Sequence, residues 1–195
     1  MRIMKFDSKI KALVVEVMQK SRCQQYTPET LCKIQKIIET QYFYYWSMDM
    51  KKEEYAADLF TKDFVYNCFG EQDISGEEQA MRSKYVNRNM CTMHMSHQPL
   101  IWLIDETNAR GIFLYEDHHT YKSSENDTVQ NCSVYCDDFR LCEDGLWRIS
   151  RMRVAFRKMD GHFKETDPPE GWEPKSIDPW TPAAEMQKEQ CPENK

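Results

Sequence analysis

Four candidate β-strands in the second half of the chain, joined by short polar connections, restrict the fold more than any other feature. The last connection, residues 143–146 (Glu-Asp-Gly-Leu), is a tight-turn sequence of the kind that closes a β-hairpin. Strands linked in this way usually pair with their neighbours in the sequence, so we predict one antiparallel sheet. The candidate strands cover residues 100–104, 111–121, 132–142 and 147–157.

Helices are predicted before these strands. Residues 8–24 carry apolar side chains at helical spacing. A longer helix should begin at Pro28, because Thr27 can cap it and proline is favoured in the first helical turn. Shorter elements are expected over residues 53–60 (helix), 64–69 (strand) and 76–88 (helix). This order predicts an α+β fold, a cone-shaped barrel in which a curved antiparallel sheet wraps around N-terminal helices and leaves an open ligand pocket.

The composition changes along the chain and suggests three parts. Residues 1–27 are interpreted as an N-terminal extension with a short helix, and residues 28–165 as the barrel domain. Residues 166–195 hold six of the eight prolines together with many charges, which is typical of an irregular tail. Trp172 and Trp180 suggest that part of this tail docks on a protein surface.

Charge and motifs exclude several classes of protein. A net charge of −6 provides no basic field for nucleic acid or an anionic membrane, and no apolar stretch is long enough to span a bilayer. The N-terminus lacks a signal-peptide pattern, and eight cysteines without Cys-x-x-Cys spacing suggest reduced thiols in a cytoplasmic protein. Glycine-rich nucleotide motifs and metal-ligand spacings are also missing, so we expect no cofactor and no metal.

The segment from Thr92 to Pro99 places two of the five histidines, His94 and His97, beside the most apolar strand candidate. Imidazole is the side chain best suited to acid–base chemistry near neutral pH. In an extended strand residues 94 and 97 point to opposite faces, so only one can face a cavity, and the sequence leaves open which. The competing interpretation is a histidine that hydrogen-bonds to backbone or carboxylate and has no catalytic role.

Several stretches resemble the SnoaL-like group of the nuclear transport factor 2-like superfamily, and within it the bile-acid 7-dehydratases. They read, in order, YYWSMD…DLFTKDFVY, TMHMSHQP, GIFLYED and YCDDFRLCEDGLWRIS, and the similarity covers roughly residues 30–163. The resemblance implies a cone-shaped barrel that forms homo-oligomers, dimers or trimers, through its sheet. It also implies a steroid substrate, a bile acid or its coenzyme A thioester, that loses a 7-hydroxyl group as water. The long terminal extensions favour the type that acts on the 7β epimer.

The resemblance also implies a catalytic set, carried over by motif to Tyr44, Asp49, His94, Asp117 and Arg157. A one-residue length difference near the last strand makes Arg153 an alternative to Arg157. On an ideal helix Tyr45 and Asp49 share a face, whereas Tyr44 lies about 140° away from Asp49. The implied pair therefore requires Asp49 to lie beyond the end of the helix.

Three functions remain open from the sequence. The first is the dehydratase, and the second is a ketosteroid-isomerase-like or polyketide-cyclase-like enzyme of the same fold. The third is a non-catalytic ligand-binding or scaffold protein, since one fold hosts many functions. Structural roles also exist for the candidates: Tyr44 as a core aromatic, Asp49 as a helix cap and Asp117 as the partner of a nearby histidine or arginine. A dry pocket bearing His, Asp and Tyr together favours an enzyme, and a filled cone favours a scaffold.

Overall fold

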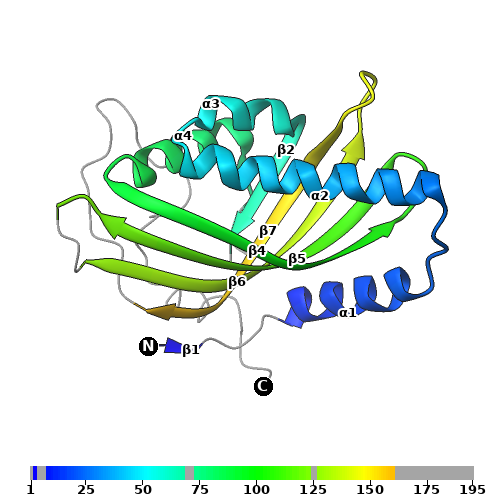
Figure 1. Cartoon of the computed structure of the whole chain (residues 1–195), viewed down its shortest axis with the longest axis horizontal. Coiled ribbons are helices and arrows are strands. Elements are labelled where there is room, and N and C mark those ends of the chain that lie inside the picture. The colour runs from blue at the N-terminus through cyan, green and yellow to red at the C-terminus, as the bar shows by residue number, and fades with distance from the viewer. Residues whose placement is uncertain (1, 4–7, 69–72, 124–126, 161–195) are drawn as a thin grey trace.

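The computed structural model describes residues 2–3, 8–68, 73–123 and 127–160. A curved sheet forms the centre, with helix α2 (Pro28–Asp49) along one face and helix α1 (Ser8–Arg22) against the other (Figure 1). Two shorter helices, α3 (Glu53–Ala56) and α4 (Gly76–Asn87), and the 3-10 turn η1 (Ala57–Leu59) follow α2. The predicted α+β architecture is confirmed. The tail with Trp172 and Trp180 lies outside the described residues.

The sheet has the strand order β3-β2-β7-β6-β5-β4, with β1 added on β7. Strands β4 to β7 pair antiparallel in sequence order, as the hairpin pattern predicted. Strand β2 pairs with β7 in parallel, which was not predicted, because the two segments lie far apart in the chain. The strands are β1 (Arg2–Ile3), β2 (Phe60–Cys68), β3 (Ile74–Ser75), β4 (Met90–Leu103), β5 (Asn108–Tyr121), β6 (Thr128–Leu141) and β7 (Trp147–Asp160).

Helix α2 has well-defined ends. At its start Thr27 and Thr30 form a capping box, in which each hydroxyl accepts the backbone N–H of the other residue at 3.2 Å and 2.7 Å. At its end the N–H of Lys52 donates to Ser47 O at 2.8 Å, and Lys51 adopts a left-handed conformation with φ 56°. Asp49 is consequently the last residue inside the helix, and its side chain leaves the helix on the face that Tyr45 shares.

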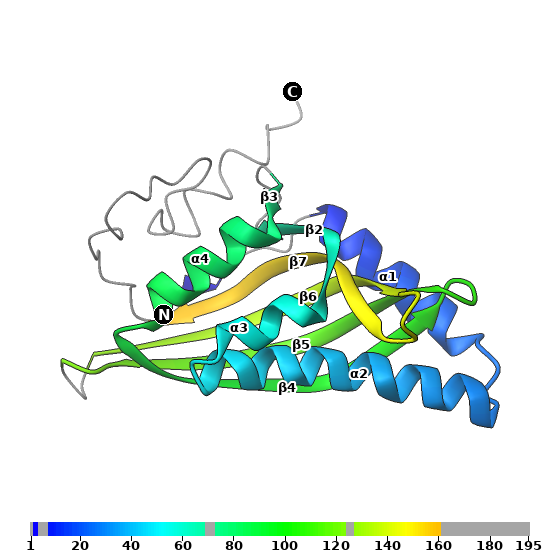
Figure 2. The same cartoon turned by 90° about the horizontal axis from the view of Figure 1, so that it is seen from above.

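The two faces of the sheet are covered by different helices. The main core lies between α2 and the sheet, and it includes Ile37 and Met48 from the helix together with Phe113 and Phe139 from the strands. Figure 2 shows α2 running beside β4, the edge strand of the sheet. On the opposite face α1 buries a smaller cluster of Val17, Ile112, Val134 and Cys136. None of the described helices is long and apolar enough to cross a membrane.

Strand β4 contains a β-bulge at residues 98–99. Before it, His94 pairs with Asp117, and after it Ile101 pairs with Gly111, so the eight residues 94–101 on β4 oppose the seven residues 111–117 on β5. The extra residue is accommodated at Gln98, whose φ is 46°. Proline next to this bulge is tolerated because β4 is an edge strand. As a result His94 and Ile101, an odd number of residues apart, both face α2.

Two adjacent carboxyl groups on β6 have opposite environments. Asp137 is completely buried; its Oδ1 accepts the N–H of Arg153 at 3.1 Å, and its Oδ2 has no hydrogen-bond partner among the described residues. Burial, with a smaller contribution from the charge of Asp138, raises the pKa of Asp137 well above its usual range. Burial also disfavours ionisation of Asp138, but hydrogen bonds from Arg153 (2.7 Å) and Arg110 (2.6 Å) outweigh it and lower its pKa.

These opposite shifts predict opposite effects of amide substitution on stability. Folded Asp137 retains its proton where the unfolded chain has lost it, so this group makes the protein less stable as pH rises above about 4. We expect Asp137→Asn to raise the free energy of unfolding at pH 7.5 by more than about 1 kcal/mol, with little change at pH 4. Asp138→Asn should lower the free energy of unfolding at pH 7.5. The Asp138 carboxylate stabilises the folded protein at every pH above the pKa that this group has in the unfolded chain. Urea denaturation at both pH values measures this; equal changes in the two variants would contradict the assignment.

Candidate active site

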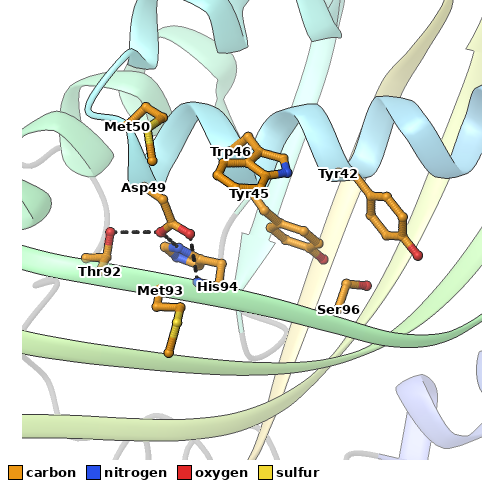
Figure 3. A pocket seen from close by; sticks show the side chains of 9 residues that line it. All are labelled: Tyr42, Tyr45, Trp46, Asp49, Met50, Thr92, Met93, His94 and Ser96. Atoms are coloured by element: carbon orange, nitrogen blue, oxygen red, sulfur yellow. Dashed lines mark hydrogen bonds and ion pairs between the residues drawn. The ribbon is translucent and has the colours of Figure 1, made fainter.

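A pocket of about 560 Å³ opens between the C-terminal half of α2 and the N-terminal half of β4. Figure 3 shows side chains of the helix and the strand meeting across this pocket. Apolar groups dominate its mouth, where Trp46, Met50 and Met93 are all more than half exposed. The lining residues are Tyr42, Tyr45, Trp46, Asp49, Met50, Thr92, Met93, His94 and Ser96.

Asp49 and His94 form a hydrogen-bonded pair in the wall of this pocket. The Nδ1 of His94 contacts Oδ1 of Asp49, and the backbone N–H of His94 donates to Oδ2 at 2.9 Å (Figure 3). Both side chains are largely buried, with 8% of His94 and 13% of Asp49 exposed. With Nδ1 directed at the carboxylate, Nε2 is the ring atom that remains to exchange a proton with a ligand. His97, by contrast, is exposed.

The surroundings keep Asp49 ionised. Burial by itself would raise the pKa of this carboxyl group. Hydrogen bonds from the ring and backbone of His94 and from the Thr92 hydroxyl (3.0 Å) outweigh burial, so the pKa of Asp49 lies below its usual range. A charged carboxylate behind Nδ1 fixes the orientation of the imidazole and stabilises the ring when it carries a positive charge.

Two tyrosines of α2 lie near this pair in different ways. The Tyr45 ring stacks parallel to the His94 ring with centroids 6.2 Å apart, and its hydroxyl accepts a hydrogen bond from Gln41 Nε2 at 2.9 Å. Burial raises the pKa of Tyr45 well above its usual range, so its hydroxyl stays protonated. Tyr44 belongs to the main core, packs against Phe60 with centroids 5.7 Å apart, and is not among the side chains that line the pocket.

Asp117 forms a second pair, with His119; the sequence interpretation included Asp117 in the catalytic set and named His119 only as one of its possible structural partners. The carboxylate contacts Nε2 of His119 and also accepts a hydrogen bond from Asn131 Nδ2 at 2.9 Å. Its other oxygen, Oδ1, is buried and has no hydrogen-bond partner among the described residues. The His119 ring stands edge-on to His94 with centroids 5.6 Å apart, so the two Asp–His pairs lie side by side. The spacing of Asp117 and His119, two residues apart on one strand, places both on the same face.

Of the two arginine candidates, Arg157 and Arg153, only Arg153 has a side chain that the structure describes. The structure describes the backbone of Arg157 within β7 but not its side chain. The guanidinium of Arg153 binds Asp138 at 2.7 Å and the carbonyl of Cys136 at 3.3 Å, and Arg153 does not line the pocket. The structure therefore brings Asp49 and His94 together in the pocket, places Asp117 beside them through His119, and leaves Arg157 untested.

The described residues contain no group of three or more His, Cys, Asp or Glu side chains arranged to hold a metal ion. What the pocket does offer is an imidazole with an oriented carboxylate, a protonated phenol and an apolar entrance. Such a set can remove a proton from a bound molecule and stabilise negative charge that develops on it.

The sequence model of the SnoaL-like domain family matches residues 29–153. Solved structures with the same fold include a candidate scytalone dehydratase from Novosphingobium aromaticivorans, with 19% identity and a TM-score of 0.63 over 74% of this chain and 97% of that one. A hexachlorocyclohexane dehydrochlorinase, LinA type 3 from Novosphingobium barchaimii, has 15% identity and a TM-score of 0.60 over 72% and 97%. At these identities the similarity establishes the fold alone. No curated protein matches the chain in sequence.

Proposed function

We propose that this chain, which belongs to the SnoaL-like domain family, is a lyase that eliminates water from a 7-hydroxy-3-oxo-4-ene bile acid or its coenzyme A thioester. The observation that carries the proposal is the Asp49–His94 pair in the wall of an open pocket. An open pocket with an acid–base pair argues against a filled, purely structural cone. Its volume of about 560 Å³ lies in the range of small-molecule sites, and its apolar mouth suits a fused-ring skeleton.

The proposed reaction needs one base and one acid. The enone makes the C6 hydrogen acidic by conjugation, and Nε2 of His94 takes it as a proton to leave a dienolate. The dienolate expels the C7 hydroxyl group, which receives the proton from the imidazolium and departs as water. The product is a 4,6-diene, and nothing has been oxidised or reduced. Asp49 supports this cycle because a carboxylate stabilises the imidazolium formed between the two proton transfers.

Negative charge on the C3 oxygen of the dienolate needs a hydrogen-bond donor. By resemblance this donor is Tyr44, whereas the lining of the pocket supports Tyr45, which stays protonated and stacks on His94. Oriented donors of this kind typically contribute about 3 kcal/mol to the stability of such a transition state. The Asp117–His119 pair lies next to His94, but neither residue is among those that line the pocket, so we assign it no contact with the substrate.

Turnover can be measured directly with the purified protein. Extending an enone to a dienone moves its ultraviolet absorption to longer wavelength, which provides the readout. The substrates are the 7α and the 7β epimers, each as free acid and as thioester. We expect a longer-wavelength product whose mass is lower by one water, formed without added cofactor, and we favour the 7β epimer. A product of unchanged mass would indicate a ketosteroid-isomerase-like reaction instead. If no epimer in either form is converted, the dehydratase proposal fails.

A further inference from the structure

A chain of hydrogen bonds connects Lys51, through Thr92, to the Asp49–His94 pair. The ammonium group of Lys51 donates to Thr92 Oγ1 at 2.7 Å, and Thr92 Oγ1 donates to Asp49 Oδ1 at 3.0 Å. A lysine ammonium group can only donate, so the Thr92 hydroxyl must accept from it, and its single proton is then directed at Asp49. Both oxygens of Asp49 are therefore held, Oδ2 by the backbone of His94 and Oδ1 by Thr92 and the ring.

The backbone at Lys51 also fits this interpretation. Lys51 has φ 56°, a left-handed conformation that closes helix α2 and that normally favours glycine or asparagine. A side chain at this position turns back from the helix end toward β4, where it reaches Thr92. Lysine near a helix C-terminus also interacts favourably with the helix dipole. Lys52, the next residue, is exposed and pairs with Glu54 at 3.7 Å, so it shares the favourable terminus but not the contact with Thr92.

We infer that Lys51 and Thr92 are positioning residues of the proposed acid–base pair: they orient Asp49 and tune how strongly it stabilises protonated His94. This inference rests on the proposed role of His94. A cation linked to Asp49 through one hydroxyl group withdraws negative charge from the carboxylate. The charged imidazole is then stabilised less, and His94 remains available as a base at lower pH.

Other groups that face His94 are unchanged by substitution at these two positions. Tyr45 stacks on the ring from α2, and Tyr115 and His119 approach it from β5 with centroids at 5.5 Å and 5.6 Å. Of these, His119 is a second imidazole, and its ring contacts Asp117. The experiment must therefore follow the His94 ring separately from the His119 ring.

The test uses Lys51→Met and Thr92→Val, with Lys52→Met and Thr92→Ser as matched controls. We expect both test variants to move the acidic limb of the kcat/KM profile to higher pH by about half a unit or more, and to lower kcat/KM about 10-fold at its optimum. Lys52→Met should change neither the position of the acidic limb nor kcat/KM. Thr92→Ser should keep both close to the values of the unsubstituted protein, because serine retains the hydroxyl group. A role limited to folding would lower the amount of active enzyme without moving the limb.

The same comparison can be made without turnover, which separates this inference from the proposed reaction. NMR titration of the His94 ring, assigned by the signal lost in His94→Gln, should show protonation at higher pH in Lys51→Met and Thr92→Val than in Lys52→Met. The inference is overturned if the His94 titration and the acidic limb stay unchanged in both test variants while these remain folded by circular dichroism. If the titration moves but no bile acid is converted, the positioning role stands and the proposed substrate is wrong.

Discussion

His94→Gln should reduce the rate of water elimination by a factor of about 10²–10⁴, the usual contribution of general acid–base catalysis. Glutamine is similar in size and still hydrogen-bonds, but it cannot accept a proton at neutral pH. The substituted residue lies in the wall of an open pocket, so the melting temperature should change little. Steady-state rates from the dienone absorption, together with a thermal melt of each variant, measure both effects.

The control for this variant is His97→Gln on the same strand. His97 is exposed and does not line the pocket, so the control should retain nearly full activity. If His97→Gln abolishes activity while His94→Gln does not, the assignment of the base is wrong, although the fold is unaffected.

Loss of the phenol that holds the C3 oxygen should reduce the rate by about 10²–10³. Tyr44→Phe and Tyr45→Phe each remove a single hydroxyl group and differ by one position on α2. The resemblance predicts the larger loss for Tyr44→Phe. The lining of the pocket and the stacking on His94 predict it for Tyr45→Phe.

Measuring both variants at saturating and limiting substrate separates loss of binding from loss of transition-state stabilisation. The donor is the tyrosine whose loss lowers kcat and kcat/KM together. If both variants keep full activity, neither phenol stabilises the dienolate, and the assignment of a tyrosine as the donor is wrong.

Much of the fold could be predicted because its signals are local. Thr27 and Pro28 marked the start of α2, and Gly145, with φ 79°, occupies the hairpin turn that its sequence indicated. The pairing of β2 with β7 could not be predicted, since no local pattern identifies a parallel partner distant in the chain. The apolar run from Leu100 to Ile104 predicts a strand only over residues 100–104, whereas β4 extends from Met90 to Leu103, because its first half carries polar residues and gives no apolar signal.

Only part of the candidate site could be predicted from the sequence, because some of its contacts join residues that are distant in the chain. Asp49 and His94 were named from motifs, and the structure places them in contact. His119 could be named only as one possible partner of Asp117, because its edge-on position beside His94 is a contact between neighbouring strands rather than a sequence motif. The choice between Tyr44 and Tyr45 depended on where α2 ends. Since Asp49 is still helical, Tyr45 shares its face, which helical spacing alone had indicated.

The bulge at Gln98 also determines which insertions and deletions this strand can accept. Before the bulge β4 presents His94 to the pocket, and after it the strand presents Ile101 to the core. These two residues are seven positions apart, so in a regular strand they would point to opposite faces. A relative with one residue fewer between these positions could keep only one of them inward, because a shift of one residue exchanges the faces of a strand. Changes of two residues would preserve both. When related chains are aligned, the length of this segment, and not only the presence of a histidine, therefore indicates whether the base still faces the pocket.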